Sequence, residues 1–106
     1  MYGAILGDII GSPYEFDQGD KTKNFPLFSA CSEFTDDTVM TCAVAEGIRV
    51  GLRQLPADWM DEPGAEDILT ASVRDALILY GRKYPNAGYG GSFRRWLASP
   101  DPQPYN

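Results

Sequence analysis

The stretch "SEFTDDTVMTCAVAEGI", from Ser32 to Ile48, places two adjacent aspartates directly ahead of an apolar pattern. The apolar and small residues that follow recur at the spacing of one helix face, and they are Met40, Ala43, Val44, Gly47 and Ile48. This spacing predicts an amphipathic helix that begins at Thr35. Gly51 is expected near its C-terminal cap, where glycine is common.

The segment "GAILGDIIGSPYEF" predicts an earlier helix, which Pro13 ends because the residue before a proline disfavours helical angles. Gly3, Gly7 and Gly11 are four residues apart and therefore share one helix face. A glycine in a helix interior costs roughly 1 kcal/mol relative to alanine. We therefore expect this stripe to let another backbone come close.

A third helix is expected from Ala65 or Glu66 to Lys83 or Tyr84, before Pro85. Its expected inner face consists of Leu69, Ser72, Val73, Ala76, Leu77 and Tyr80. A glycine-rich turn and a short helix are expected in "NAGYGGSFRRWL", and a loop over residues 17–33. Since no strand alternation is present, the sequence predicts one all-α domain over residues 1–106.

The composition narrows the chemistry that this chain can perform. Its 106 residues carry a net charge of −6, which disfavours binding to nucleic acid or to an anionic membrane. It has no histidine, so histidine triads, bases and metal ligands are excluded. Cys31 and Cys42 lack a C-x-x-C spacing and are expected to be reduced, with Cys42 buried. With neither a signal peptide nor a membrane-spanning run, we expect a cytoplasmic protein.

The aspartate pair has two interpretations. Thr35 or Asp36 alone would be an ordinary helix N-cap. Two adjacent carboxylates repel each other, however, and only one can take the capping position, so the other needs a cation, an arginine or open water. Carboxylate and hydroxyl oxygens are hard ligands that suit Mg²⁺, Ca²⁺ or Mn²⁺. Asp8 and Glu15 would add carboxylates if the first helix packs against the second.

Together, "GAILGDIIGSPYEF", "FTDDTVM" and "AGYGGSFRRWL" resemble, in this order, the N-terminal part of the ADP-ribosylglycohydrolase family, which includes the dinitrogenase reductase-activating glycohydrolases. The resemblance covers nearly the whole chain. It implies a compact all-α domain with a site for two Mg²⁺ or Mn²⁺ ions. It also implies cleavage of the glycosidic bond that joins ADP-ribose to arginine, serine or another acceptor, in a protein or a small molecule.

The resemblance also assigns roles to individual residues. Thr35, Asp36 and Asp37 resemble the N-terminal metal ligands of the family, and Glu15 resembles a glutamate proposed there as an acid/base or gating residue. Asp8 resembles a motif aspartate with a supporting role. A loop lines the ADP-ribose site in the family, and the residues of this chain that resemble it are Gly88, Tyr89, Gly90 and Gly91. A plain turn, with Tyr89 serving only in packing, is an equally good interpretation of that loop.

The chain departs from the family in one respect. Family members are much longer, and the C-terminal Asp/Thr cluster that completes their two-metal site has no counterpart here. We therefore expect the N-terminal portion of such a domain, without measurable hydrolase activity alone. Two other classes remain open: a non-catalytic scaffold, and an assembly subunit that self-associates or needs a complementing chain to complete its core.

Overall fold

The computed structural model describes residues 1–15 and 25–104. The helices are α1 (Tyr2–Gly11), α2 (Asp36–Arg53), α3 (Ala65–Lys83) and α4 (Gly91–Ala98), with short 3₁₀ turns η1 (Ser12–Tyr14) and η2 (Trp59–Asp61). The described part of the chain contains no strand, which confirms the all-α prediction. Over the same residues, no helix has the length and apolar character needed to cross a membrane.

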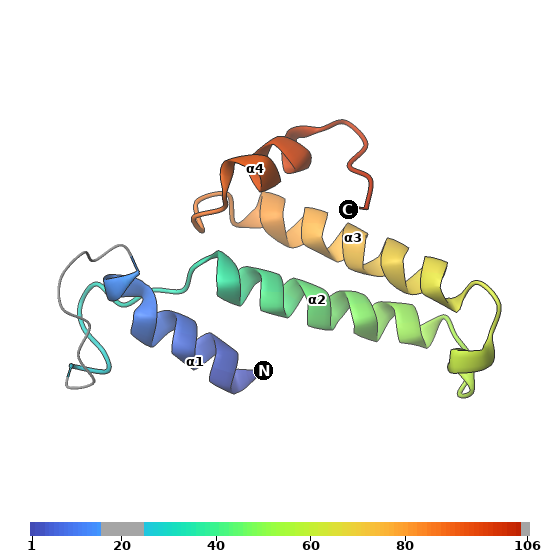
Figure 1. Ribbon diagram of the computed structural model, residues 1–106, viewed down its shortest axis with the longest axis horizontal. Helices are drawn as coiled ribbons and strands as arrows, with labels where there is room; N and C mark the ends of the chain where they lie inside the picture. Colours follow the sequence, from blue (N-terminus) through green and yellow to red (C-terminus); the bar gives the residue numbers. More distant parts are fainter. Residues whose placement is uncertain (16–24, 105–106) are drawn as a thin grey trace.

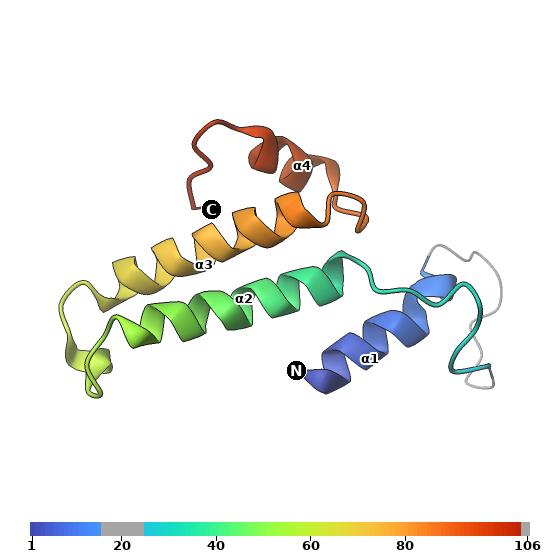
Figure 2. The same cartoon turned by 180° about the vertical axis from the view of Figure 1, so that it is seen from behind.

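The centre of the fold is an antiparallel hairpin of α2 and α3. Figures 1 and 2 show α1 lying beside the first half of α2, and α4 lying on the far side of α3. The helices therefore follow one another across the molecule in chain order. The N-terminus of α2 lies at the end of the hairpin where the last residues of α1 and the loop before α4 also lie.

A row of small residues lets α2 and α3 approach closely. The residues of α2 that are buried lie four apart: Val39, Ala43, Gly47 and Gly51. A Cβ atom placed on Gly47 would lie 2.5 Å from the Cα atom of Val73. At this separation the neighbouring backbone would have to move, so the close approach of the two helices requires glycine here.

The short helix α4 is attached to the C-terminal half of α3. Leu97 lies against Gly81, where a Cβ would meet the leucine side chain at 2.8 Å. The guanidinium group of Arg82 donates hydrogen bonds to the carbonyl oxygen of Leu97, with distances of 2.9 and 3.2 Å. Leu97 also joins Val39 and Tyr89 in the hydrophobic core, so α4 closes the core at the N-terminal end of α2.

The predicted helices are present, with corrections to α2. Gly51 is not a C-terminal cap, because the helix continues to Arg53 and Gly51 packs against Leu69 and Ser72 of α3. Ala43 and Gly47 are buried as expected, but Val44 and Ile48 are 38% and 42% exposed. The small-residue row forms the contact with α3, so the larger apolar residues beside it are left on the flank.

Two other expectations were wrong for the described residues. No atom lies within 4 Å of a Cβ placed on Gly3, Gly7 or Gly11, so the stripe on α1 does not receive another backbone there. Cys42 is half-buried rather than buried. The first part of the predicted loop, residues 17–24, lies outside the described residues, whereas residues 25–33 are irregular as expected.

The chain is extended for its size and buries little apolar surface. Its radius of gyration is 16.9 Å, whereas a compact domain of this length has about 13 Å. The core residues that are buried are mostly small, namely Val39, Ala43, Ala65, Ala76, Tyr89 and Leu97. Large apolar side chains such as Leu6 and Leu79 stay exposed. The described helices thus present apolar faces that they do not cover among themselves.

We predict that Gly47→Ala lowers the free energy of unfolding by about 1–2 kcal/mol, because overpacking against the α3 backbone outweighs the gain in helix propensity. The matched control is Gly7→Ala in α1, where the new methyl group meets no other atom within 4 Å. That change is expected to stabilise the protein by up to about 1 kcal/mol. Urea denaturation followed by circular dichroism measures the free energy of unfolding of both variants. Equal effects of the two changes would contradict the requirement for glycine at the contact between α2 and α3.

Candidate metal centre at the N-terminus of α2

The N-terminus of α2 uses its free backbone donors within the chain. A helix leaves its first four N–H groups without intrahelical partners. The amide of Asp36 donates to the carbonyl oxygen of Ala87 at 2.7 Å. The amide of Asp37 points at the hydroxyl of Thr35 at a long 3.4 Å, while the amides of Thr35 and Thr38 donate to the carboxylate of Asp8. The aspartate pair is therefore not needed to cap its own helix.

Asp8 is the residue that supplies most of this cap, from a different helix. Its Oδ2 atom accepts hydrogen bonds from the amide of Thr35 at 2.7 Å and from the amide and hydroxyl of Thr38 at 3.2 and 2.6 Å. Its Oδ1 atom accepts a hydrogen bond from the hydroxyl of Thr35. Four donors thus converge on one half-buried carboxylate, at the positive end of the α2 dipole.

These contacts decide the ionisation of Asp8. Partial burial alone would raise its pKa, but the hydrogen bonds from the side chains of Thr35 and Thr38, and then from their amides, lower the pKa below its usual value. Asp8 is therefore held as a carboxylate. Ser12 adds a second link between the two segments, since its hydroxyl donates to the carbonyl of Ile9 and accepts from the amide of Glu33.

Asp36 borders a cavity of about 490 Å³. Glu15, Thr35 and Lys83 also line it, together with Gly88 from the loop before α4. Gly88 has a φ angle of +100°, which glycine adopts far more readily than other residues. With Glu33, which also lines it, this cavity brings together a threonine, three carboxylates and an ammonium group from three separate segments.

Asp37 borders a different cavity, of about 460 Å³, which Asp8 and Glu15 also line. Consecutive residues on a helix point about 100° apart, so neighbouring aspartates cannot face the same direction. Glu15 lines both cavities. The predicted acidic residues thus line two cavities at the N-terminus of α2, and Glu15 is the predicted residue that lines both.

The four residues of the predicted glycine loop have separate positions. Gly88 lines the cavity beside Asp36, whereas Gly90 lines another cavity, between α3 and α4. Gly91 is the first residue of α4. The ring of Tyr89 is 4% exposed and packs against Phe93 with ring centroids 5.1 Å apart. Tyr89 therefore has a packing role, as one of the two interpretations of the sequence expected.

The hydroxyl group of Tyr89 is buried and has no hydrogen-bond partner among the described residues. Burial raises the pKa of Tyr89, and the nearby negative charge of Asp36 raises it further. Tyr89 is therefore held in its neutral form.

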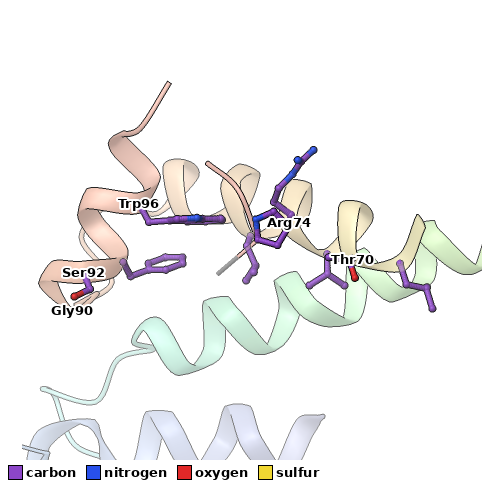
Figure 3. Close-up of a pocket in the computed structure, with 10 residues that line it drawn as sticks. Thr70, Arg74, Gly90, Ser92 and Trp96 are labelled. Carbon is purple, nitrogen blue, oxygen red and sulfur yellow. The ribbon is translucent and has the colours of Figure 1, made fainter. Parts of the chain in front are cut away.

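Another cavity, of about 680 Å³, lies between α3 and α4, and no acidic side chain lines it. Figure 3 shows Thr70 and Arg74 of α3 and Ser92 and Trp96 of α4 among the residues that line it. Leu69, Val73, Leu77 and Phe93 make most of its lining apolar. Arg74 is the charged residue that borders it, and it is paired with Asp75. This cavity does not offer the oxygen ligands that the sequence predicted for a metal.

The residues at the N-terminus of α2 suit a hard cation in their chemistry. The hydroxyl of Thr35 and the carboxylates of Asp36, Asp37 and Glu15 are oxygen donors of the kind that Mg²⁺ and Mn²⁺ prefer. Over residues 1–15 and 25–104, no three acidic or cysteine side chains lie close enough together to hold an ion by themselves. Thr35 and the aspartates would therefore provide part of a coordination shell.

Thr35 is the N-cap residue of α2, as one interpretation of the sequence expected, but sequence reasoning did not find the contacts that other segments make with this helix end. It placed Asp8 near the site but did not pair it with Thr35 and Thr38, which lie 27 and 30 residues away along the chain. It also did not find the bond from Asp36 to Ala87. The available signal was local: an aspartate near the end of an apolar helix needs donors, and Thr35 and Thr38 are spaced one turn apart.

The fold and this site define a helical protein with an oxygen-rich, acidic site at a helix N-terminus. Sequence comparison then gives the family. The model of the ADP-ribosylglycohydrolase family matches residues 1–102, and the chain therefore belongs to that family, which is generally metal-dependent. Comparisons with curated proteins and with solved structures found no match.

We predict a pH-dependent role for Asp8 in stability. A carboxyl group whose pKa is lowered by folding stabilises the protein above its unfolded value of about 3.9, and this contribution is lost as the pH falls through the lower folded value. Asp8→Asn should therefore cost about 1–2 kcal/mol of unfolding free energy near pH 6, as expected for hydrogen bonds to a charged group.

The difference between the parent and Asp8→Asn should shrink below about pH 4, because Asp8 of the unfolded parent then takes up a proton that the folded protein still excludes. Glu15 and Asp37, which line the same cavity, are unchanged between the two proteins. Urea denaturation at several pH values measures the difference. A difference that stays constant from pH 6 to pH 3 would contradict the role assigned to the Asp8 charge.

Proposed function

We propose that this chain provides part of the active site of a hydrolase that cleaves the glycosidic bond between ADP-ribose and a protein side chain or small acceptor. In this proposal Thr35, Asp36 and Asp37 contribute ligands for Mg²⁺ or Mn²⁺, and Glu15 is the acid/base residue. The substrate is an ADP-ribosylated protein or a small molecule that contains ADP-ribose. Family membership supports the class of reaction.

One observation of the structure carries the proposal. Asp8 and the carbonyl oxygen of Ala87 accept hydrogen bonds from the amides at the start of α2, so the side chains of Asp36 and Asp37 are not needed as caps. Each of the two aspartates borders a cavity that Glu15 also lines. A purely structural N-cap would direct its carboxylate at the helix amides instead. Asp36 and Asp37 therefore keep their charges available to a ligand in the two cavities.

The chemistry assigned to the chain follows from these positions. Glu15 is exposed and lines the cavity beside each aspartate, where it can exchange a proton with water or with the leaving group. The ammonium group of Lys83 borders the cavity beside Asp36 and can attract an anionic part of the substrate. When bound, divalent cations would stabilise negative charge and orient the ribose hydroxyls and water.

The backbone around Gly88 completes this assignment. Its positive φ angle and open Cβ position allow the chain to come close to a ligand in the cavity. Gly90 and Gly91 follow at the start of α4, where helix N–H groups favour anions. We assign this loop to the ADP-ribose moiety, with the ring of Tyr89 anchoring it in the core.

The proposal includes a reducing compartment, the cytoplasm. Its support is that Cys31 and Cys42 are both free thiols in the structure. Disulfides are rare in reducing compartments, where thiols such as these persist.

We predict that Mn²⁺ raises the melting temperature of the parent chain and that Asp37→Asn abolishes this rise. A ligand that binds only the folded state stabilises it in proportion to the logarithm of its concentration over Kd. Without metal, Asp37→Asn should be as stable as the parent or slightly more stable, because the repulsion with Asp36 is removed. Thermal unfolding with and without Mn²⁺ measures both effects.

The matched control for this experiment is Asp75→Asn, an exposed aspartate of α3 whose carboxylate pairs with Arg74. It should keep the full response to Mn²⁺. If calorimetric titration of the parent chain shows no saturable Mn²⁺ binding, the proposed metal role of the aspartate pair is wrong.

A second candidate is an assembly subunit, which one observation favours. The described helices leave large apolar side chains exposed, among them Leu6, Ile48, Met60 and Leu79. Exposed apolar surface of this kind usually marks contact with other protein surface. The chain is also more extended than a compact domain of its length.

This candidate predicts that the purified chain self-associates as its concentration rises. Light scattering after size exclusion measures the molar mass across a concentration series. A monomer of 11.7 kDa at every concentration, with a cooperative melt, would contradict it. The experiment is independent of metal binding, so it separates this candidate from the hydrolase proposal.

A further inference from the structure

The hydrogen-bond geometry around Asp8 fixes the direction of the Thr35 hydroxyl group. A threonine hydroxyl has one hydrogen to donate and two lone pairs. The Oγ1 atom of Thr35 lies at hydrogen-bond distance from Oδ1 of Asp8. Because a carboxylate only accepts hydrogen bonds, the hydroxyl must be the donor, and its hydrogen points toward Asp8.

The remaining capacity of the Thr35 hydroxyl is therefore that of an acceptor. One lone pair faces the amide of Asp37, at a long 3.4 Å. The second lone pair of Thr35 Oγ1 accepts no hydrogen bond from the described residues. Thr35 also lines the cavity of about 490 Å³ that Asp36 and Glu15 share. An oxygen held in this state can bind a cation but cannot donate a hydrogen bond to an anion or to water.

Asp8 itself is poorly placed to be a metal ligand. Its Oδ2 atom accepts three hydrogen bonds and its Oδ1 atom accepts one, so one lone-pair site, on Oδ1, is left without a donor. A cation bound through Oδ2 would have to compete with the donors that hold α1 against α2. Its role is therefore exerted through Thr35.

Resting on the proposed function, we infer that Asp8 is a positioning residue that turns the Thr35 hydroxyl into an obligate oxygen ligand for a divalent cation. An asparagine in place of Asp8 could not do this. The amide nitrogen of asparagine is a donor, so the Asp8→Asn variant would satisfy only part of the four donors that now converge there, and the hydroxyl could rotate its hydrogen into the site. Residues that orient metal ligands typically change metal affinity by about 10–100-fold when mutated.

The test is a calorimetric measurement of Mn²⁺ affinity at pH 7, at a temperature where circular dichroism shows each variant to be folded. Asp8→Asn should weaken Mn²⁺ binding about tenfold. Thr35→Ser keeps the hydroxyl and should bind within about twofold of the parent, whereas Thr35→Val should lose affinity by a similar factor to Asp8→Asn. Asp75→Asn, the same chemical change at a remote exposed site, should bind like the parent.

A double variant separates orientation from other effects of Asp8. If Asp8 acts through the hydroxyl, Asp8→Asn should cause little further loss in the Thr35→Val background. An equal loss in both backgrounds would show that Asp8 acts by its charge or as a direct ligand, and would overturn the inference. So would an Asp8→Asn variant that folds and binds Mn²⁺ as tightly as the parent.

The outcomes also distinguish this inference from the proposed function. If the parent binds Mn²⁺, Asp37→Asn does not, and Asp8→Asn binds normally, the metal site stands and the orienting role of Asp8 is wrong. If the parent shows no saturable binding, the proposed metal site is wrong, and the role of Asp8 toward a metal is overturned with it.

Discussion

The four hydrogen bonds to Asp8 join the two segments on which the candidate site depends. They connect the last turns of α1 to the first turn of α2, between residues that are far apart in sequence. Because the donors include two backbone amides at the start of α2, the same carboxylate caps the helix and holds α1 against it. The charge of Asp8 also complements the positive end of the α2 dipole.

This arrangement explains the pair of aspartates that follows. A helix N-terminus ordinarily uses the side chain of its own cap residue. Here Asp8 and the carbonyl of Ala87 take up most of the donors, so Asp36 and Asp37 project into the cavities on either side of Glu15. The repulsion between the two carboxylates is therefore kept in the folded chain, and a bound cation is what would offset it.

The sequence predicted most of the helices, because periodicity and helix-ending signals are local. Pro13 ended α1 and the acidic start of α3 was found at Ala65. The sequence did not predict which helix faces would contact other helices, because this depends on residues that are distant in the chain. Gly47 and Gly51 form the seam with α3, whereas the more regular stripe of Gly7 meets no neighbouring atom, and no property of a single helix distinguishes the two cases. The Asp8 contacts were missed for the same reason.

In the proposed site, a divalent cation binds beside the aspartates that Asp8 leaves free. The most direct test is the broadening of amide NMR signals by Mn²⁺, since a paramagnetic ion affects the nuclei closest to it first. At low Mn²⁺ concentrations, the signals of Glu15, Asp36, Asp37 and Gly88 should broaden before those of the α2–α3 turn around η2. Broadening first at the acidic residues of that turn, Asp61 and Glu62, or equally across the chain, would contradict the account.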